Sequence, residues 1–307
     1  MINGIACEKR RFPTNPDGHR MFSIFFRLLL ATIVFAVAAR ADAQLEDVST
    51  IHWAYSTYFG TGWYQIGEDR DAFAIRFALR KPLRKASLNE DGSRTIGMEL
   101  RFPITLGLDH FPLDDIEGSL DPDNLANISV TPSIYFDLPM NERWMLRPFV
   151  AAGWGTVLNG DESAWTYWTG LRSRFRFKTG NVESALINSI GFVGYTPSTG
   201  PSTNFWPITT VVEMAAPLGN LRLDGRQLVL HWHAGYTFFR DDLDIVRRDL
   251  TTEQISDQWE LGLAVSKVDE RIRVWRFSFD RVGLAYRFSS DGELKGLGLQ
   301  FRSLFDQ

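Results

Sequence analysis

The chain has 307 residues, of which 44% are hydrophobic, 13% aromatic and 23% charged. This composition excludes a disordered chain, which would be poor in aromatic residues, and ordinary Gly and Pro usage excludes a collagen-like or low-complexity chain. The formal net charge of −4 provides no basic field that could hold a nucleic-acid backbone, so we expect no nucleic-acid partner.

The N-terminal residues have the layout of an export signal. Arg20 and Arg27 supply positive charge, and the twelve-residue apolar run Leu28–Ala39 has the length of a signal core. The run is too short for a membrane-spanning helix, which needs about 20 apolar residues. Residues 21–43 are therefore predicted to be a signal peptide, and a short buried helix is the competing interpretation.

This prediction divides the chain into three parts. Small residues at Ala41 and Ala43 favour cleavage after Ala43, residues 1–20 are expected to be untranslated or disordered, and residues 44–307 form the mature domain. Cys7, the only cysteine in the sequence, lies ahead of the signal. We therefore expect no disulfide, thiolate metal site or cysteine nucleophile in the mature domain.

Beyond Gln44, apolar residues alternate with a period of two. The clearest case is Thr95–Leu108, where every second residue from Ile96 to Leu108 is apolar, seven in all. No helix explains this spacing. Segments with this alternation, or a weaker form of it, are 50–64, 73–79, 96–108, 128–138, 144–158, 171–177, 182–195, 204–217, 228–238, 259–265, 282–288 and 297–305. They predict about twelve strands, and an even number places both termini of a closed barrel on one side.

Two all-β folds fit this pattern. In a soluble sandwich the apolar face forms the core, whereas in an outer-membrane barrel it meets lipid and the polar face lines the lumen. The polar positions are rich in Gly, Ala, Ser and Thr beside Arg and Glu, which suits a crowded barrel interior. Aromatic residues at segment ends, typical of interfacial girdles, are Trp53, Tyr55, Trp63, Tyr64, Trp144, Trp154, Trp165 and Trp206. We therefore predict an all-β fold consisting of a single antiparallel transmembrane β-barrel.

The connections predict that both termini are periplasmic. Short turns follow the fourth, sixth and eighth strands, at Pro139–Arg143, Lys178–Asn181 and Gly219–Gly225. The long connections Asp109–Asn127 and Arg240–Gln254 are then extracellular loops, while Lys81–Arg94 is longer than a periplasmic turn usually is. Because proline forfeits a ladder hydrogen bond, bulges or strand ends are expected at Pro103, Pro132, Pro148 and Pro207.

Two stretches of sequence carry a family resemblance. Asp280–Phe305 resembles the closing hairpin of bacterial outer-membrane barrels, and Phe305 is similar to the terminal aromatic residue that the barrel-assembly machinery reads as an assembly signal, although Asp306 and Gln307 follow it. Val130–Gly155 resembles a strand-turn-strand unit of autotransporter-type barrels. Together with its size, the mature chain resembles the solitary outer-membrane autotransporter barrel family, which is a translocator without a passenger.

Charged residues on the polar parity are expected to line the lumen. They are Arg76, Arg80, Glu99, Arg101, Asp137, Arg147, Arg172, Arg174, Arg176, Glu213, His231, His233, Glu260, Arg281, Arg287 and Arg302. In an open channel the basic residues would attract anions. The favoured alternative is a filled lumen in which the arginines pair with the four acidic residues, because unpaired charges away from bulk water are costly.

Catalytic and metal sites have weaker support. His231 and His233 share one strand face and could bind a metal or act as a general base. No third metal ligand is identifiable and no serine nucleophile follows them, so we favour lumen packing and assign no catalytic residue, metal or cofactor. The acidic loop Asp109–Asn124 lacks EF-hand spacing and is interpreted as a solvated loop that divalent ions could bridge to lipopolysaccharide.

The sequence thus predicts an exported, non-enzymatic outer-membrane β-barrel of Gram-negative type with a structural or passive-pore role. Expected partners are outer-membrane lipids, lipopolysaccharide and the barrel-assembly machinery, with small solutes if the lumen is open. Because only Gln44–Thr50 precede the first expected strand, we expect no passenger and no plugging helix. The alternatives are a lipid- or peptide-acting outer-membrane hydrolase using rim residues and, less favoured, a soluble periplasmic sandwich.

Overall fold

The structure is a computed structural model that describes residues 56–67, 70–89, 92–109, 125–158, 161–198, 202–246, 252–268, 271–274 and 277–306. The predicted signal peptide at 21–43, Cys7 and most of the acidic loop lie outside these residues. No helix in the described ranges is long and apolar enough to cross a membrane.

Strands account for most of the described chain. In order, the elements are α2 (Ser56–Phe59), β1 (Gly62–Ile66), β2 (Arg70–Arg84), β3 (Ser87–Leu88), β4 (Arg94–Thr95), β5 (Gly97–Asp109), β6 (Leu125–Val130), β7 (Ser133–Pro139), β8 (Trp144–Val157), β9 (Ser163–Thr179), β10 (Val182–Pro197), β11 (Thr203–Leu223), β12 (Arg226–Val246), β13 (Thr252–Lys267), β14 (Ile272–Val274), β15 (Phe277–Phe279), β16 (Val282–Phe288), β17 (Leu294–Gln300) and the 3-10 turn η3 (Leu304–Asp306).

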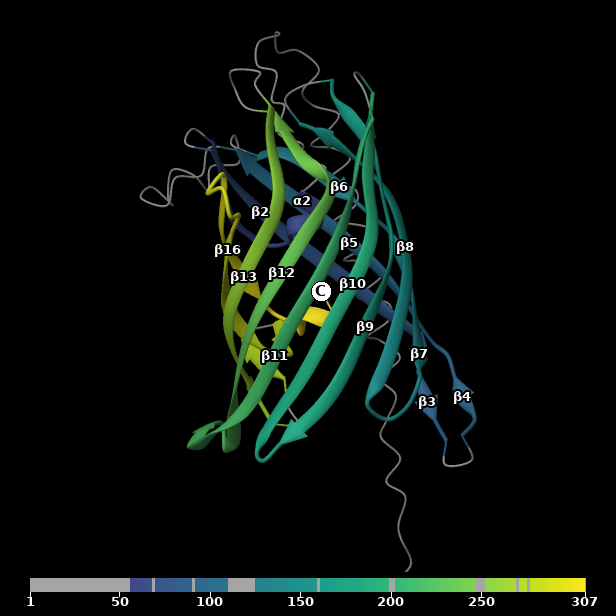
Figure 1. Cartoon of the computed structure of the whole chain (residues 1–307), viewed down its shortest axis with the longest axis vertical. Coiled ribbons are helices and arrows are strands. Elements are labelled where there is room, and N and C mark those ends of the chain that lie inside the picture. The colour runs from purple at the N-terminus through teal and green to yellow at the C-terminus, as the bar shows by residue number, and fades with distance from the viewer. Residues whose placement is uncertain are drawn as a thin grey trace, which may run out of the picture. The chain divides into compact units, whose positions relative to one another are not determined.

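One antiparallel sheet closes on itself (Figure 1). Its order is β2-β1-β17-β16-β13-β12-β11-β10-β9-β8-β6-β5-β7, and the additional pairing of β2 with β5 completes the ring. Because β6 and β7 both pair with β5 on one side and with β8 on the other, they are two halves of one wall strand. The wall therefore has twelve strands, as the sequence predicted, and the sandwich alternative is wrong.

The apolar parity of the strands faces outward. On β13, Leu261 and Leu263 are 49% and 59% exposed, whereas Ala264 on the opposite face is 3% exposed. On β17, Leu297 and Leu299 are exposed while Gln300 is buried. Apolar side chains outside and polar side chains inside are the inverse of a soluble protein and are the arrangement of an outer-membrane barrel.

Exposed tryptophans mark the height of the apolar band. Trp144 and Trp154 both face outward near opposite ends of β8. Ten residues of strand span about 33 Å, and a strand tilt of about 40° reduces that to about 25 Å, the height of a lipid-facing band. Trp165, which is paired with Trp154, and Trp206 are also exposed, so the girdle prediction is correct for these residues.

Of the other predicted girdle residues, Tyr64 does not fit. Tyr64 points into the barrel and is 4% exposed, because its ring packs on Phe59 and its hydroxyl donates a hydrogen bond to the Phe59 carbonyl. Trp63 is only half-buried on β1, and Trp53 and Tyr55 lie outside the described residues.

The two-residue turns lie at one end of the barrel (lower end in Figure 1). The β11–β12 turn at Asp224–Gly225 has positive φ at both residues, the pattern of a type I′ hairpin. Gly180 has a positive φ in the β9–β10 turn, as a type II′ turn requires. Two connections were predicted too long. β12 and β13 leave only residues 247–251 between them, and Lys81–Arg94 contains the end of β2, all of β3 and the first residue of β4.

The prolines occupy interruptions in the ladders. Pro132 lies at the break between β6 and β7, as expected of a strand end, and Pro103 faces this break from β5. Pro148 and Pro207 lie inside β8 and β11, which corrects the expectation of strand ends or bulges. Each proline pairs with a residue of the neighbouring strand on one side. On its other side the ladder has no pair at the proline and resumes beyond it in the same register. A proline can therefore stand in a closed wall where one ladder is locally open.

The outward face gives a mutational test. Leu263→Lys places a charge in the middle of the apolar band and should lower the free energy of unfolding by roughly 2–4 kcal/mol. Leu221, 61% exposed near the tight turn at Asp224–Gly225, is a matched control whose lysine variant should cost about 1 kcal/mol or less. Urea unfolding in lipid vesicles measures both, and equal costs would contradict a lipid-facing position for Leu263.

Candidate functional site

The barrel interior is the candidate site, because the strands direct their charged side chains into it. The predicted lumen-lining arginines Arg101, Arg147, Arg172, Arg281 and Arg287 are all buried, as is His233. Predicted residues that are half-buried are Arg76, Arg80, Glu99, Asp137, Arg174, Glu213, His231, Glu260 and Arg302. Arg176, near the turn end of β9, is exposed, and Arg302 follows β17 instead of lying on a strand.

The first inner element is α2, which precedes β1 and lies within the barrel (Figure 1). Tyr58 on α2 makes edge contacts with Trp168 of β9, Phe205 of β11 and Phe239 of β12, with ring centroids 5.5, 5.5 and 6.2 Å away. Burial raises the pKa of Tyr58 above its ordinary value, so its hydroxyl stays neutral. This aromatic layer reaches the far wall and corrects the expectation that residues near 56–59 continue the first strand.

A charged network anchors α2 to the near wall. Arg287 on β16 donates hydrogen bonds to the Phe59 carbonyl and, at 2.9 Å, to the Tyr64 hydroxyl. The Arg287 guanidinium also pairs with the Glu260 carboxylate, whose other oxygen lies 2.9 Å from His233 Nε2. The carboxylate of Glu260 is thus shared by an arginine and a histidine from neighbouring strands.

Close approach of strands shapes this network. Gly262 faces His233 across the β12–β13 ladder, and a Cβ there would lie 2.1 Å from His233 Cε1. Glycine at this position therefore makes room for the imidazole beside Glu260. A second pair joins Arg281, which precedes β16, with Glu213 of β11 at 2.8 Å, and β16 and β11 are not neighbours in the wall.

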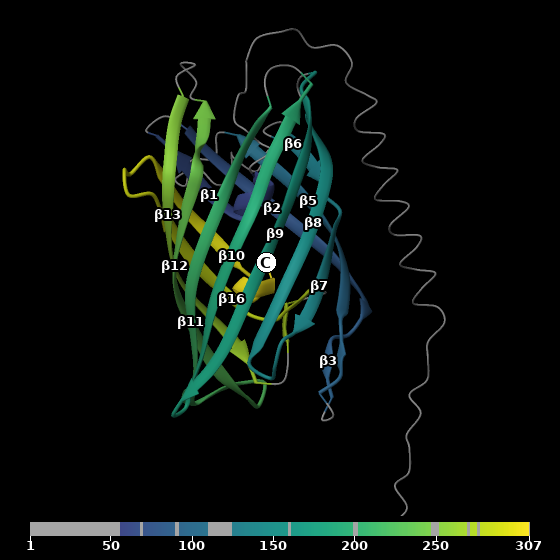
Figure 2. The same ribbon diagram turned by 45° about the vertical axis from the view of Figure 1, so that its right-hand side comes forward.

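The second inner element is the C-terminal segment, Phe301–Asp306. β17 ends at Gln300, so the predicted continuation of the last strand to Phe305 is wrong. The chain then turns inward and ends near the middle of the barrel in both views (Figures 1 and 2). Phe305 is fully buried with Ile187 of β10 and Val211 of β11. Its role as an assembly signal stays a prediction, but in the folded barrel this aromatic ring is not on a strand.

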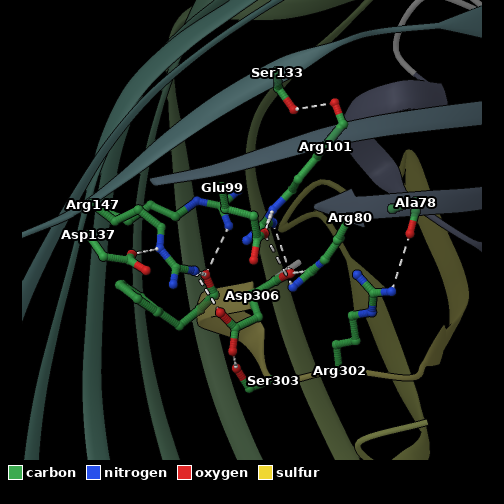
Figure 3. Close-up of polar contacts among 12 residues, drawn as sticks. Ala78, Arg80, Glu99, Arg101, Ser133, Asp137, Arg147, Arg302, Ser303 and Asp306 are labelled. Carbon is green, nitrogen blue, oxygen red and sulfur yellow. Dashed lines mark hydrogen bonds and ion pairs between the residues drawn. The ribbon is translucent and has the colours of Figure 1, made fainter. Parts of the chain in front are cut away.

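Five arginines from four strands surround the C-terminal segment. This arginine cage consists of Arg80 of β2, Arg101 of β5, Arg147 of β8, and Arg172 and Arg174 of β9. Arg80 and Arg101 donate to the Asp306 carbonyl, the latter at 3.0 Å (Figure 3). Arg147 donates to the Phe305 carbonyl at 3.0 Å and to Asp306 Oδ1 at 2.6 Å.

The aromatic ring of the segment completes the contacts. The guanidinium carbons of Arg147 and Arg174 lie 4.2 and 4.4 Å from the centroid of the Phe305 ring, within cation–π range. Arg172 donates to the Phe305 carbonyl at 3.3 Å. The predicted basic ladder of β9 therefore holds part of this chain, through Arg172 and Arg174.

Asp306 is charged under ordinary conditions. Burial alone would raise its pKa, but the charge and hydrogen bond of Arg147, helped by the Ser303 hydroxyl, hold the pKa below its usual value. A carboxylate with a lowered pKa stabilises the folded state at pH values above the ordinary pKa of aspartate. This stabilisation is lost only as the pH falls through the lowered pKa. The contact between Asp306 and Arg147 therefore persists at neutral and mildly acidic pH.

The predicted charge pairing is present in the lumen. Glu99 pairs with Arg101 at 2.5 Å, Asp137 with Arg147 at 2.5 Å, and Glu213 and Glu260 with the partners described above. The sequence could identify these residues because they share one parity. The sequence analysis missed α2 and the C-terminal segment. The signals available for the C-terminal segment were the polar residues after Phe301 and the acidic residue after Phe305.

The histidines do not form a metal site in the described part of the chain, where no cluster of three potential ligands occurs. His231 Nε2 lies 2.8 Å from the hydroxyl of Ser266, a contact between strands that the local sequence did not reveal. The other ring nitrogen of His231 is buried without a hydrogen-bond partner among the described residues. His231 thus lacks the orienting partner of a catalytic histidine, and His233 is held by Glu260 within the buried network, so we assign no catalytic role to this pair.

The buried network predicts a large and specific effect on stability. Glu260→Gln leaves the buried Arg287 without its counter-charge and should lower the free energy of unfolding by about 3–5 kcal/mol. Asp280→Asn breaks the exposed ion pair of Asp280 with Arg271 and should change the free energy of unfolding by about 1 kcal/mol or less. Urea titration of both variants in micelles measures the difference. Similar losses would mean that the Glu260 network does not carry buried charge.

No family model and no curated protein matches the chain. Solved structures with a similar backbone include the β domain of the Bordetella autotransporter BrkA, which is 9% identical with a TM-score of 0.48 over 79% of this chain and 96% of that chain. The transport unit of the autotransporter AIDA-I from Escherichia coli is 12% identical, with a TM-score of 0.43 over 89% and 97%.

The siderophore receptor PirA from Pseudomonas aeruginosa is 11% identical, with a TM-score of 0.32 over 76% of this chain and 37% of that chain. All three TM-scores are below 0.5, so the closed twelve-stranded barrel rests on the strand pairing described above. The first two structures are parts of autotransporters.

Proposed function

We propose that this chain is an integral β-barrel of the bacterial outer membrane with a structural role, and that its lumen is closed in the resting state. The observation that carries the proposal is the outward apolar parity, illustrated by Leu261 and Leu263 of β13 and Leu297 and Leu299 of β17. Such a surface is stable in hydrocarbon and prone to aggregation in water.

Export and orientation complete this proposal. Residues 21–43 would direct the chain across the inner membrane, and the barrel-assembly machinery would insert the mature domain. The tight turns at 180–181 and 224–225 support a periplasmic position for their end of the barrel, since periplasmic turns are short. Outer-membrane lipids and lipopolysaccharide are then its partners, the latter at the end that carries the long connection 110–124.

The inner segments favour a closed barrel over a passive pore. α2 connects the near wall with β9, β11 and β12, and the C-terminal segment reaches β8, β9, β10 and β11. Two levels of the lumen are thus crossed by protein, and the lumenal carboxylates are paired with basic residues. An open water-filled channel has neither feature.

Cell fractionation and electrophoresis test the proposal. The mature chain should be found in the outer-membrane fraction, and unboiled samples should migrate differently from boiled ones because the closed barrel resists detergent. In planar bilayers the inserted barrel should show little steady conductance. A chain that stays soluble without detergent would contradict the membrane location, and a large constant current would contradict the closed state.

A further inference from the structure

The arginine cage is organised by the barrel wall independently of the segment that it holds. Arg101 pairs with Glu99 and its guanidinium carbon lies 3.8 Å from the centroid of the Tyr135 ring. Arg147 pairs with Asp137, and Arg172 lies over the rings of Phe149 and Trp168. These wall contacts hold the guanidinium groups in place, so the cage is preorganised for a ligand.

The described ion pairs within the barrel wall of this region contain more guanidinium groups than carboxylates. The cage has five arginines, and the wall carboxylates that pair with them are Glu99 and Asp137. The segment adds the Asp306 carboxylate, which pairs with Arg147, and backbone carbonyls that accept hydrogen bonds from the cage. Guanidinium groups in such number match phosphate and carboxylate oxygens, with which they form directed, charge-assisted hydrogen bonds.

Outside the cage, the segment contacts the wall through Phe305, which is buried with Ile187 and Val211, and through Arg302, which donates to the Ala78 carbonyl. The C-terminal segment is not part of the β-ladder, because the pairing of β17 ends at Gln300. Its backbone carbonyls at Phe305 and Asp306 and the Asp306 carboxylate are the groups that the cage holds. The segment is also covalently joined to β17. This strand lies opposite β9, six strands away in either direction around the ring.

We propose that the arginine cage is a lumenal binding site for small multivalent anions bearing phosphate or carboxylate oxygens, and that the C-terminal segment occupies it as a tethered ligand. A multivalent anion competes for the same guanidinium groups and releases the segment from the lumen wall. The inference rests on the proposed membrane barrel and adds to it a ligand class and a movable element.

Cysteine labelling tests the competition without requiring a current. The mature domain is free of cysteine, since Cys7 is the single one in the sequence. Leu304→Cys therefore places a unique thiol on the segment, and Ser303→Cys provides a second reporter if the first fails to fold. Inorganic tripolyphosphate should accelerate maleimide labelling several-fold over sodium chloride of equal ionic strength, and citrate tests whether carboxylates suffice. Labelling rates that neither anion changes would overturn the proposal.

Two buried arginines provide matched variants. Arg147→Gln removes a cage residue, whereas Arg281→Gln removes an arginine that is paired with Glu213 outside the cage. In the reporter background, Arg147→Gln should label fast without anion and lose much of the anion response, while Arg281→Gln should behave like the parent. Identical behaviour of the two variants would overturn the assignment of the site.

The same samples separate the two proposals. Heat-modifiable migration shows whether each variant has formed the barrel, and its absence in the parent chain would count against the proposed function. A barrel with normal migration but an anion-insensitive thiol would leave the proposed function standing and refute the anion site.

Discussion

The structure depends on one constraint: apolar residues of the wall strands form the outward face, so the polar residues of the opposite face must find partners inside. Hydrocarbon offers no hydrogen bonds, and a closed barrel is one of the two structures that satisfy the backbone there. Leu263 and Ala264 illustrate how sharply adjacent residues differ, because successive side chains of a strand point to opposite faces. The outer surface, the girdle and the location of all charged groups follow from this division.

The many charged side chains inside the barrel need partners. Buried ions are costly unless they are paired and hydrogen-bonded, and the lumen meets this need with carboxylates shared between strands, such as Glu260 between His233 and Arg287. Where arginines outnumber wall carboxylates, the chain supplies Asp306 and peptide carbonyls from its own C-terminus. The same electrostatic demand that stabilises the closed state thus creates a site at which an external anion can compete.

Strand positions and faces could be predicted because a period of two is visible within one segment, as in Thr95–Leu108. The pairing of lumenal charges was also accessible, since residues of one parity must share the interior. The inward course of Tyr64 and Phe305 was not, because each depends on contacts with distant strands. The alternation of apolar residues continues in sequence to Phe301 and is broken at Ser303, and the contacts of Asp306 with the cage hold the chain that follows β17 inside the barrel.

The central claim is tested most directly by spin labels on two neighbouring residues of β10. Ile190 faces outward and Ser189 faces the lumen, at almost the same depth in the wall. In the inserted barrel, a label at Ile190→Cys should be relaxed more strongly by molecular oxygen, which dissolves in lipid, than by a water-soluble nickel reagent. A label at Ser189→Cys should show less oxygen relaxation. Reversed accessibility, or water access equal at both sites, would contradict an apolar parity that faces hydrocarbon.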